Sequence, residues 1–201
     1  VYMILYINAC IRPGSRTNIL AKELISLLND TVTELFLPEL DLKPLSLDLL
    51  NKRTSLIESN DYSDPMFDYA KQFAAADTII IGAPYWDLSF PAILKIYLEN
   101  IYVTGIVSKY DENGVPVGLC KANKLYYITT AGGPYNSDFS FLYIKEMTTK
   151  YFGIPEVELI DAEYLDVDGY DADQIITDAK QKIHFKDDLQ KIRSGKGDSL
   201  F

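Results

Sequence analysis

The sequence predicts an α/β protein built on a doubly wound, five-stranded parallel sheet with helices on both faces. Apolar runs of strand length alternate five times with amphipathic helical patterns along the 201 residues. This alternation is typical of a parallel sheet that is covered on both sides. Two of the runs, Ile79–Ala83 and Leu125–Thr129, are rich in β-forming residues and nearly continuously apolar. Such strands are expected to be buried on both faces of the sheet.

The remaining elements follow from the same periodicities and from residues that begin or end helices. The other three strands are predicted at Tyr2–Ile7, Thr31–Leu37 and Val157–Ile160. Helices are predicted after Thr17 as N-cap through Leu28, from Asp64 and Pro65, over 91–103, from Ser137 to a stop at Gly153, and over 171–192.

Two insertions interrupt the alternation. Residues 38–63 form a long, leucine-rich connection, which we expect to pack on the body of the protein and to cover a site. Residues 107–120 contain Asn113-Gly114 between apolar flanks, which is a strong signal for a small β-hairpin. We expect a single domain over 1–201, with 193–201 as a loose tail.

The charge balance argues against one class of partner. The chain has 19 basic and 29 acidic residues, a net charge of −10, and no basic cluster, so we expect no nucleic-acid partner. Residues 156–178 carry nine of the acidic residues and no basic one, and we interpret them as a solubilising edge, with docking to a redox partner as the alternative.

Other features of the composition indicate a cytoplasmic protein. No apolar run is long enough to span a membrane, and the apolar start of the chain is too short for a signal segment. The two cysteines, Cys10 and Cys120, form no CxxC motif, which suits a reducing compartment.

Ligands of open parallel sheets bind beyond the carboxyl ends of the strands, which here directs attention to the loops 8–17, 84–91 and 130–137. The first loop holds Arg12, Ser15, Arg16 and Thr17, has no acidic residue and leads into a helix, so it can bind an anion. A capped helix start with solvated arginines is the alternative. The loop lacks GxGxxG and GxxxxGK[ST], which disfavours a dinucleotide or nucleoside-triphosphate site.

The other two loops suit a flat ring. Residues Pro84 to Pro91 include Tyr85, Trp86, Asp87 and Leu88, a rigid aromatic wall, although Trp86 could simply cap the core. The third loop holds Thr130, Ala131, Gly132, Gly133 and Tyr135, and its paired glycines indicate either a turn with positive φ or a close approach of the backbone to a ligand.

The three loops together indicate more than each does alone. They follow the first, third and fourth strands, which adjoin one another in one common order of doubly wound sheets. A ligand with a phosphate at one end and a flat ring at the other would contact all three, and flavin mononucleotide (FMN) has that shape.

The chain resembles the flavodoxin-like FMN-dependent NAD(P)H oxidoreductases, the group of azoreductases and NAD(P)H:quinone reductases. The resemblance rests on Asn8–Asn18, Gly82–Pro91, the Tyr110–Leu119 hairpin and Thr129–Pro134. It implies non-covalent FMN, with the phosphate on Ser15–Thr17 near Ala9, the ring against Tyr85–Leu88, and Thr130–Gly133 around the pyrimidine. The chain departs from the azoreductase pattern at Asp87, where that pattern has an amide, and at Ala131, where it has a charged residue.

The resemblance also implies a reaction. NADH or NADPH would reduce the flavin at N5, and a quinone, azo or nitroaromatic acceptor would then take two electrons in the same place, a ping-pong order. The flavin carries this chemistry, so no catalytic side chain and no metal are assigned. His184 is interpreted as structural or solvated, and Cys10 as a small buried residue.

The oligomeric state and two rival functions are open to test. The predicted helix 91–103 is clearly polar only at Lys95, Glu99 and Asn100, which together with the resemblance predicts a homodimer. A flavodoxin-type electron carrier and a flavin-free binding or signalling module are the alternatives to the enzyme. The sequence leaves open the acceptor and the choice between NADH and NADPH.

Overall fold

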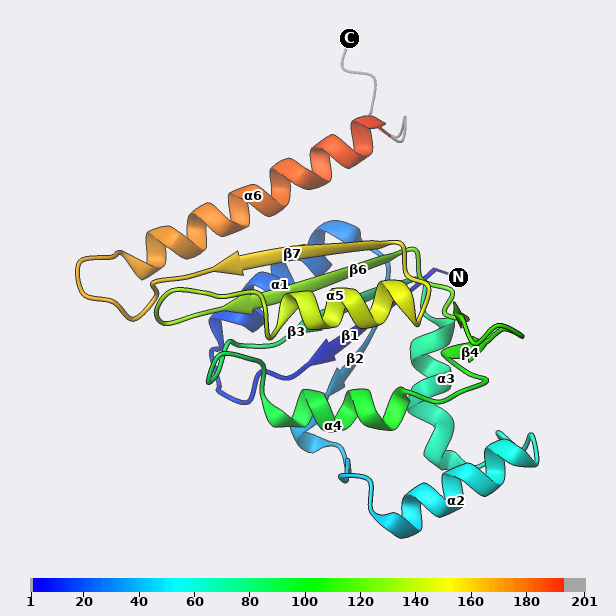
Figure 1. The fold of residues 1–201 in the computed structure, drawn as a ribbon. Helices are drawn as coiled ribbons and strands as arrows, with labels where there is room; N and C mark the ends of the chain where they lie inside the picture. The colour runs from blue at the N-terminus through cyan, green and yellow to red at the C-terminus, as the bar shows by residue number, and fades with distance from the viewer. Residues whose placement is uncertain (1, 194–201) are drawn as a thin grey trace.

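A computed structural model gives the structure of residues 2–193, with side chains described as far as residue 185. It contains a five-stranded parallel sheet in the order β2-β1-β3-β6-β7, together with a two-stranded antiparallel sheet, β4-β5 (Figure 1). The predicted fold class is confirmed, and the strands that precede the three candidate loops are the neighbours β1, β3 and β6.

The sheet strands agree with the predicted runs to within two residues at each end. The strands are β1 Met3–Asn8, β2 Thr31–Phe36, β3 Thr78–Gly82, β6 Lys124–Thr130 and β7 Glu156–Ala162. Every residue of the central β3 is buried, as its apolar composition predicts.

Helices cover both faces of the sheet. The α-helices are α1 Arg16–Leu28, α2 Leu47–Glu58, α3 Asp68–Ala75, α4 Ala92–Ile101, α5 Phe141–Lys150 and α6 Ala172–Arg193, and the 3-10 helices are η1 Leu37–Glu39 and η2 Pro65–Phe67. Apolar residues of α1 and α6 share one core cluster with Tyr6 and Ile80, whereas α3, α4 and α5 pack in a second cluster on the opposite face with Leu5 and Ile79. The sheet therefore has a core on each side.

Three helix starts differ from the predictions. Helix α1 begins at Arg16, because Ser15 Oγ accepts the backbone N–H of Asn18 and so acts as the N-cap instead of Thr17. Helix α5 begins at Phe141, since a turn closed by the Ser140 N–H on the Ser137 carbonyl precedes it. Asp64 caps the short η2, and α3 follows directly after it.

The segment 38–63 is partly helical and packs on the body of the protein, as expected, with apolar residues against a core cluster, but within one chain it lies away from the three candidate loops. Ser46 caps α2 by accepting the N–H of Leu49 at 3.2 Å, and the helix has no buried residue. The segment reaches α4 instead, where Arg53 donates to the Glu99 carbonyl and Asn100 donates to the Lys43 carbonyl, both at 3.0 Å. In Figure 1, α2 lies at the opposite end of the molecule from the three candidate loops.

The hairpin predicted in 107–120 is confirmed. Strand β4 Ser108–Tyr110 pairs antiparallel with β5 Pro116–Gly118, and Asp111 Oδ1 accepts two backbone N–H groups in the turn. None of the helices described is long and apolar enough to cross a membrane. The predicted loose tail, 193–201, lies outside the described residues except for Arg193, the last residue of α6.

Candidate functional site

The loops after β1, β3 and β6 lie together at one edge of the sheet, and Thr130 joins all three. Its hydroxyl lies 2.7 Å from the hydroxyl of Thr17 in the first loop, and its carbonyl accepts the backbone N–H of Tyr85 in the second at 3.0 Å. Arg12 also reaches from the first loop to the second, with its guanidinium 5.8 Å from the centre of the Trp86 ring, a cation–π contact.

The first loop presents positive charge at the start of α1. Ser15 caps the helix, and Arg16 occupies its first position, so the free N–H groups and the positive end of the helix dipole face the same edge of the sheet. Thr17 is fully buried, and its hydroxyl is engaged by Thr130. The groups of this loop that remain available to an anion are therefore Arg12, Ser15, Arg16 and the backbone, because the Thr17 hydroxyl is already engaged.

A buried polar network, which sequence reasoning missed, supports the first loop. Asn8 is 3% exposed; its Nδ2 donates to Glu34 Oε1 at 2.8 Å, and its Oδ1 accepts the Cys10 N–H at 2.9 Å. Burial alone would raise the pKa of Glu34, but hydrogen bonds from Lys22 and Asn8 outweigh burial and lower it. A polar residue at the end of an apolar strand was the available signal, but only the fold brings Glu34 beside it.

The second loop contains a tight turn that sets the position of Trp86. Trp86 and Ser89 exchange two backbone hydrogen bonds, at 2.9 and 2.8 Å, across Asp87 and Leu88. Both central residues are left-handed, with φ values of 49° and 68°, which is a strained conformation for leucine. Ser89 Oγ also donates to the Phe139 carbonyl at 2.6 Å, so the turn is tied to the segment before α5.

The turn exposes an apolar rim beside the loops. Leu88 and Phe139 are each more than 60% exposed, and the rings of Phe90 and Tyr143 contact one another behind them at 5.8 Å between centres. Neither Asp87 nor Leu88 lines the pocket described below, because the turn directs them to the surface of the protein.

The third loop pairs with the segment that follows β7. The N–H groups of Tyr164, Leu165 and Asp166 donate to the carbonyls of Gly133, Ala131 and Gly132, respectively. Neither glycine has a positive φ, and a Cβ on Gly132 would lie 2.6 Å from Asp166 Oδ2. The close approach at Gly132 is therefore made by this chain's own carboxylate.

Residues of all three loops line one pocket of about 530 Å³. Its walls combine the cationic helix start with an aromatic side. The lining residues are Arg12, Pro13, Gly14, Ser15, Arg16, Pro84, Tyr85, Trp86, Thr130, Ala131, Gly132, Leu165 and Asp166.

Most of the predicted site residues, but not all, face this pocket. Ala9 and Thr17 are buried beneath it. Gly133 lies just outside the lining residues, and Tyr135 packs edge-on against Tyr85 with ring centres 4.9 Å apart. The Tyr85 hydroxyl is buried and, among the described residues, has no hydrogen-bond partner.

Asp166 is the acidic residue that sequence reasoning missed. Its Oδ1 accepts a hydrogen bond from Arg16 Nη1 at 2.8 Å, inside the lining of the pocket. Glu163, from the same acidic stretch, accepts the Tyr135 N–H at 2.7 Å. The interpretation of 156–178 as only a solubilising edge was therefore incomplete, because the sheet order brings its middle to the third loop.

Cys10 and His184 have the surroundings expected of structural residues. Burial raises the pKa of the Cys10 thiol to about 11, which keeps it protonated at neutral pH. His184 Nε2 lies 2.8 Å from Glu23 Oε1 and links α6 to α1.

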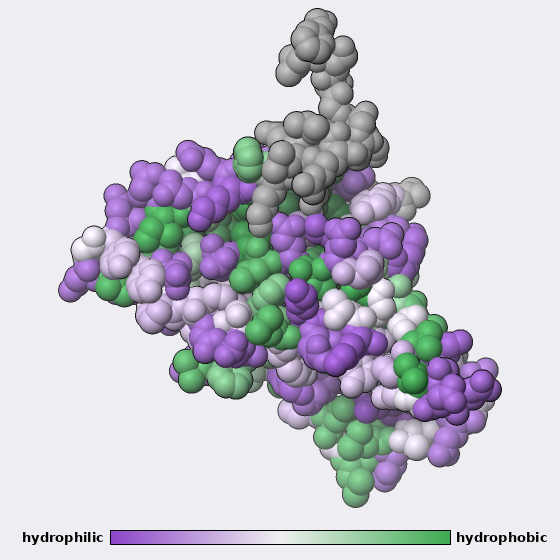
Figure 2. Space-filling model, turned by 45° about the horizontal axis from the view of Figure 1, so that its top comes forward, coloured by the Kyte–Doolittle hydropathy of each residue, from purple (hydrophilic) through white to green (hydrophobic). Residues whose placement is uncertain are grey.

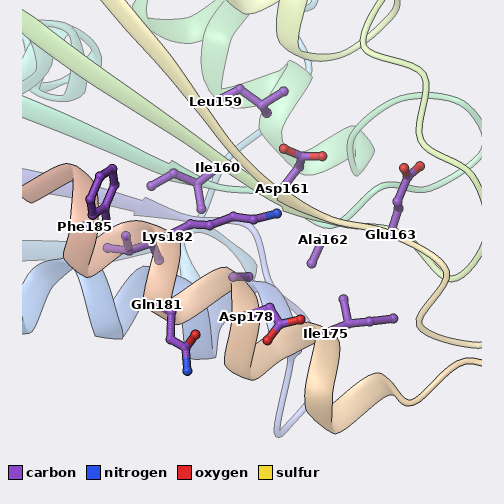
Figure 3. Close-up of a pocket in the computed structure, with 12 residues that line it drawn as sticks. Leu159, Ile160, Asp161, Ala162, Glu163, Ile175, Asp178, Gln181, Lys182 and Phe185 are labelled. Atoms are coloured by element: carbon purple, nitrogen blue, oxygen red, sulfur yellow. The ribbon is translucent and has the colours of Figure 1, made fainter.

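A second, larger groove of about 730 Å³ runs between β7 and α6 (Figure 3). It shares no lining residue with the pocket at the strand ends. Figure 3 shows Lys182 extending from α6 along this groove, whose wall also carries Asp161, Glu163 and Asp178. The groove has one basic residue among three acidic ones and no aromatic residue except Phe185, so it suits an anionic, ring-containing ligand less well.

The pocket at the strand ends can therefore bind an elongated ligand by its two ends. Arg12, Arg16 and the start of α1 suit a phosphate. Tyr85 and Trp86 suit a flat ring, and the volume lies within the range of small-molecule sites.

Two known proteins with similar sequences are named as oxidoreductases. A family model described as flavodoxin-like fold matches residues 3–185. The FMN-dependent NADH:quinone oxidoreductase of Coprothermobacter proteolyticus is 40% identical over 159 residues, which covers 76% of this chain and 78% of that protein. The FMN-dependent NADH:quinone oxidoreductase of Clostridium beijerinckii is 37% identical over 153 residues, with coverage of 69% and 76%.

Solved structures show the same fold at lower identity. An azoreductase from Bacillus anthracis str. Sterne superimposes with a TM-score of 0.80 at 24% identity, covering 93% of this chain and 99% of that one. An FMN-dependent NADH-azoreductase from Bacillus anthracis str. Ames Ancestor, in complex with FMN, gives a TM-score of 0.78 at 22% identity, with coverage of 93% and 98%.

Proposed function

The chain belongs to the flavodoxin-like family of FMN-dependent NADH:quinone oxidoreductases, and from this premise we propose that it binds FMN in the pocket at the strand ends and transfers electrons from NADH to quinone, azo or nitroaromatic acceptors. The observation that carries the proposal is the single pocket shared by Arg12, Arg16 and Trp86. A cationic end and an aromatic wall in one cavity match the two ends of this cofactor.

The groups in the pocket fit FMN. Arg12, Arg16, the Ser15 hydroxyl and the start of α1 would hold the phosphate. Pro84, Tyr85 and Trp86 would lie against the ring, and Thr130–Gly132 would line its other edge.

Bound FMN would supply two-electron chemistry, with hydride accepted at N5. The protein's own part is to hold the cofactor, to orient a flat donor or acceptor on the exposed side of the ring, and to keep water out. Leu88 and Phe139 form an exposed apolar rim beside the second loop, which supports apolar, aromatic acceptors. One place for both molecules supports a ping-pong order.

The first test is cofactor uptake followed by turnover. We expect the purified protein to show the visible absorbance of a flavin, or to acquire it with added FMN, and to oxidise NADH when a quinone or an azo dye is present. Initial rates measured against NADH concentration, at several fixed concentrations of the acceptor, should give parallel lines in a double-reciprocal plot. A protein that binds FMN without oxidising NADH would instead be an electron carrier, and one that takes up no FMN would refute the proposal.

We also propose a homodimer, which the helix α2 supports. This twelve-residue helix has no buried residue, yet it carries Leu47, 72% exposed, and Leu50 on its surface. Figure 2 shows hydrophobic surface at the lower end of the molecule, where α2 lies in Figure 1. A second copy of the chain, packed against α2, would bury this apolar surface.

Replacing both Leu47 and Leu50 by aspartate should shift the protein from dimer to monomer in light scattering at micromolar concentration, because two buried apolar contacts would become charges. The matched change Asp48→Asn with Ser55→Asp, on exposed positions of the same helix, should leave the dimer intact. A monomeric wild-type protein would contradict the proposal directly.

A cytoplasmic location remains part of the proposal. Its support is the state of the two cysteines, Cys10 and Cys120, which are both free thiols in this fold.

A further inference from the structure

A carboxylate lies among the cationic groups of the pocket. Asp166, in the segment between β7 and α6, accepts a hydrogen bond from Arg16 Nη1 at 2.8 Å, and both residues line the pocket. Arg16 is the first residue of α1, at the positive end of the helix dipole. The negative charge thus lies on the group best placed to bind a phosphate.

The backbone fixes this placement. The Asp166 N–H donates to the Gly132 carbonyl at 2.9 Å, and the Leu165 N–H donates to the Ala131 carbonyl at 3.2 Å. Asp166 Oδ2 also packs so closely on Gly132 that any side chain there would collide with it, since a Cβ would lie 2.6 Å away. Although the carboxylate is 68% exposed, its attachment to the third loop directs it into the pocket.

The ion pair must affect a phosphate that enters. Arg16 has one guanidinium, and the Nη1 hydrogen that it donates to Asp166 is not available to a phosphate oxygen. The carboxylate also repels a phosphate dianion held by Arg12 and the helix start. Both effects oppose binding at the phosphate end, whereas the aromatic end contains no part of the ion pair.

We propose that Asp166 is a specificity-determining residue of this pocket: it occupies Arg16 when no phosphate is bound and lowers the affinity for phosphate-bearing ligands without changing the affinity for the ring. The inference rests on the proposed function only in taking FMN as the ligand. The effect of Asp166 on Arg16 would apply to any ligand that carries a phosphate monoester. Removal of the carboxylate should therefore tighten phosphate binding.

The experiment compares three probes on the cofactor-free protein: FMN, riboflavin, which has the same ring and no phosphate, and inorganic phosphate. Flavin binding is followed by fluorescence quenching, and phosphate binding by the rise in Tm. Asp166→Asn keeps the size of the side chain and its backbone hydrogen bond. Asp168→Asn is the matched control, since Asp168 is an exposed residue of the same segment that does not line the pocket.

We expect Asp166→Asn to tighten FMN binding by about fivefold, the scale of one partly exposed ion pair, and to increase the Tm rise produced by phosphate. Riboflavin affinity should change by less than about twofold, and Asp168→Asn should change none of the three. In an Arg16→Gln background the gain from Asp166→Asn should be smaller, because the arginine that it releases is absent and only the repulsion between the carboxylate and the phosphate remains to be removed.

Four results would overturn the inference. Asp166→Asn could weaken FMN binding, or it could change the affinities for FMN and riboflavin by equal factors. It could also give the same gain in FMN affinity in the Arg16→Gln background as in the wild type, or leave the Tm rise produced by phosphate unchanged. Failure of the proposed function has a different signature: neither flavin binds the wild-type protein. In that case the phosphate measurement still decides the role of Asp166.

Discussion

Replacement of Asn8 by alanine should destabilise the protein by about 2–4 kcal/mol and weaken FMN binding by at least about tenfold. The side chain holds two groups at once, the Cys10 N–H at 2.9 Å and Glu34 Oε1 at 2.8 Å, and both lose their partner in the variant. A buried N–H and a half-buried carboxylate each lose a hydrogen bond without regaining full hydration. Urea unfolding and flavin fluorescence would measure the two effects.

The loss of stability should depend on pH, because Asn8 helps to lower the pKa of Glu34. A carboxyl whose pKa is lowered on folding contributes stability above its unfolded pKa, and this contribution is lost as the pH falls through the folded value. The difference between wild type and Asn8→Ala should therefore narrow in acid. The control Asn123→Ala, at an exposed position, should change stability by less than about 0.5 kcal/mol. Equal unfolding midpoints for wild type and Asn8→Ala would disprove the role of the network.

Replacement of Gly118 by alanine should cost about 3 kcal/mol or more of stability. A Cβ at this position would lie 2.2 Å from the Gly153 nitrogen and 2.3 Å from the Phe152 carbonyl carbon, which are backbone atoms and cannot rotate away. The hairpin would have to separate from the segment before β7, and the hydrogen bond from the Cys120 N–H to the Phe152 carbonyl would break. Phe152 would also lose its packing against Phe73 and Tyr102.

Gly114→Ala is the matched control in the same hairpin. A Cβ there meets no atom within 4 Å, so only its φ of 76° opposes the change, at about 1 kcal/mol. Because the hairpin joins the sheet at the amino end of β6, away from the pocket, folded Gly118→Ala should keep its FMN affinity. A Gly118→Ala protein as stable as Gly114→Ala would show that the contact with Gly153 yields easily.

The sequence was sufficient to predict those parts of the architecture whose residue pattern follows directly from burial. The runs Ile79–Ala83 and Leu125–Thr129 predict β3 and β6 because a strand buried on both faces is nearly continuously apolar. Once these strands are neighbours, the loops that follow them must meet at one edge. The meeting of the loops that carry Trp86 and Thr130 is therefore predictable without any knowledge of side-chain contacts.

Features that depend on distant partners were beyond the sequence. Thr17 looks as good a cap as Ser15, and only the hydroxyl of Thr130, 113 positions away, distinguishes their roles. Asp166 resembles the other acids of its stretch until β7 lies beside β6. Helix α2 was missed because it buries its apolar residues only partly: Leu56 and Ile57 contact a core cluster, whereas Leu47 and Leu50 stay exposed, so its apolar pattern is not confined to one face.

The position of Thr130 links the two ends of the pocket thermodynamically. Its hydroxyl contacts the helix that begins with Arg16, and its carbonyl holds the backbone of Tyr85, so one residue is hydrogen-bonded to both ends. Coupling between two binding sites is reciprocal. If a bound ring changes the affinity for phosphate by some factor, bound phosphate must change the affinity for the ring by the same factor. The affinity for riboflavin, measured with and without inorganic phosphate, would give that factor, since the two ligands represent the two halves of the cofactor.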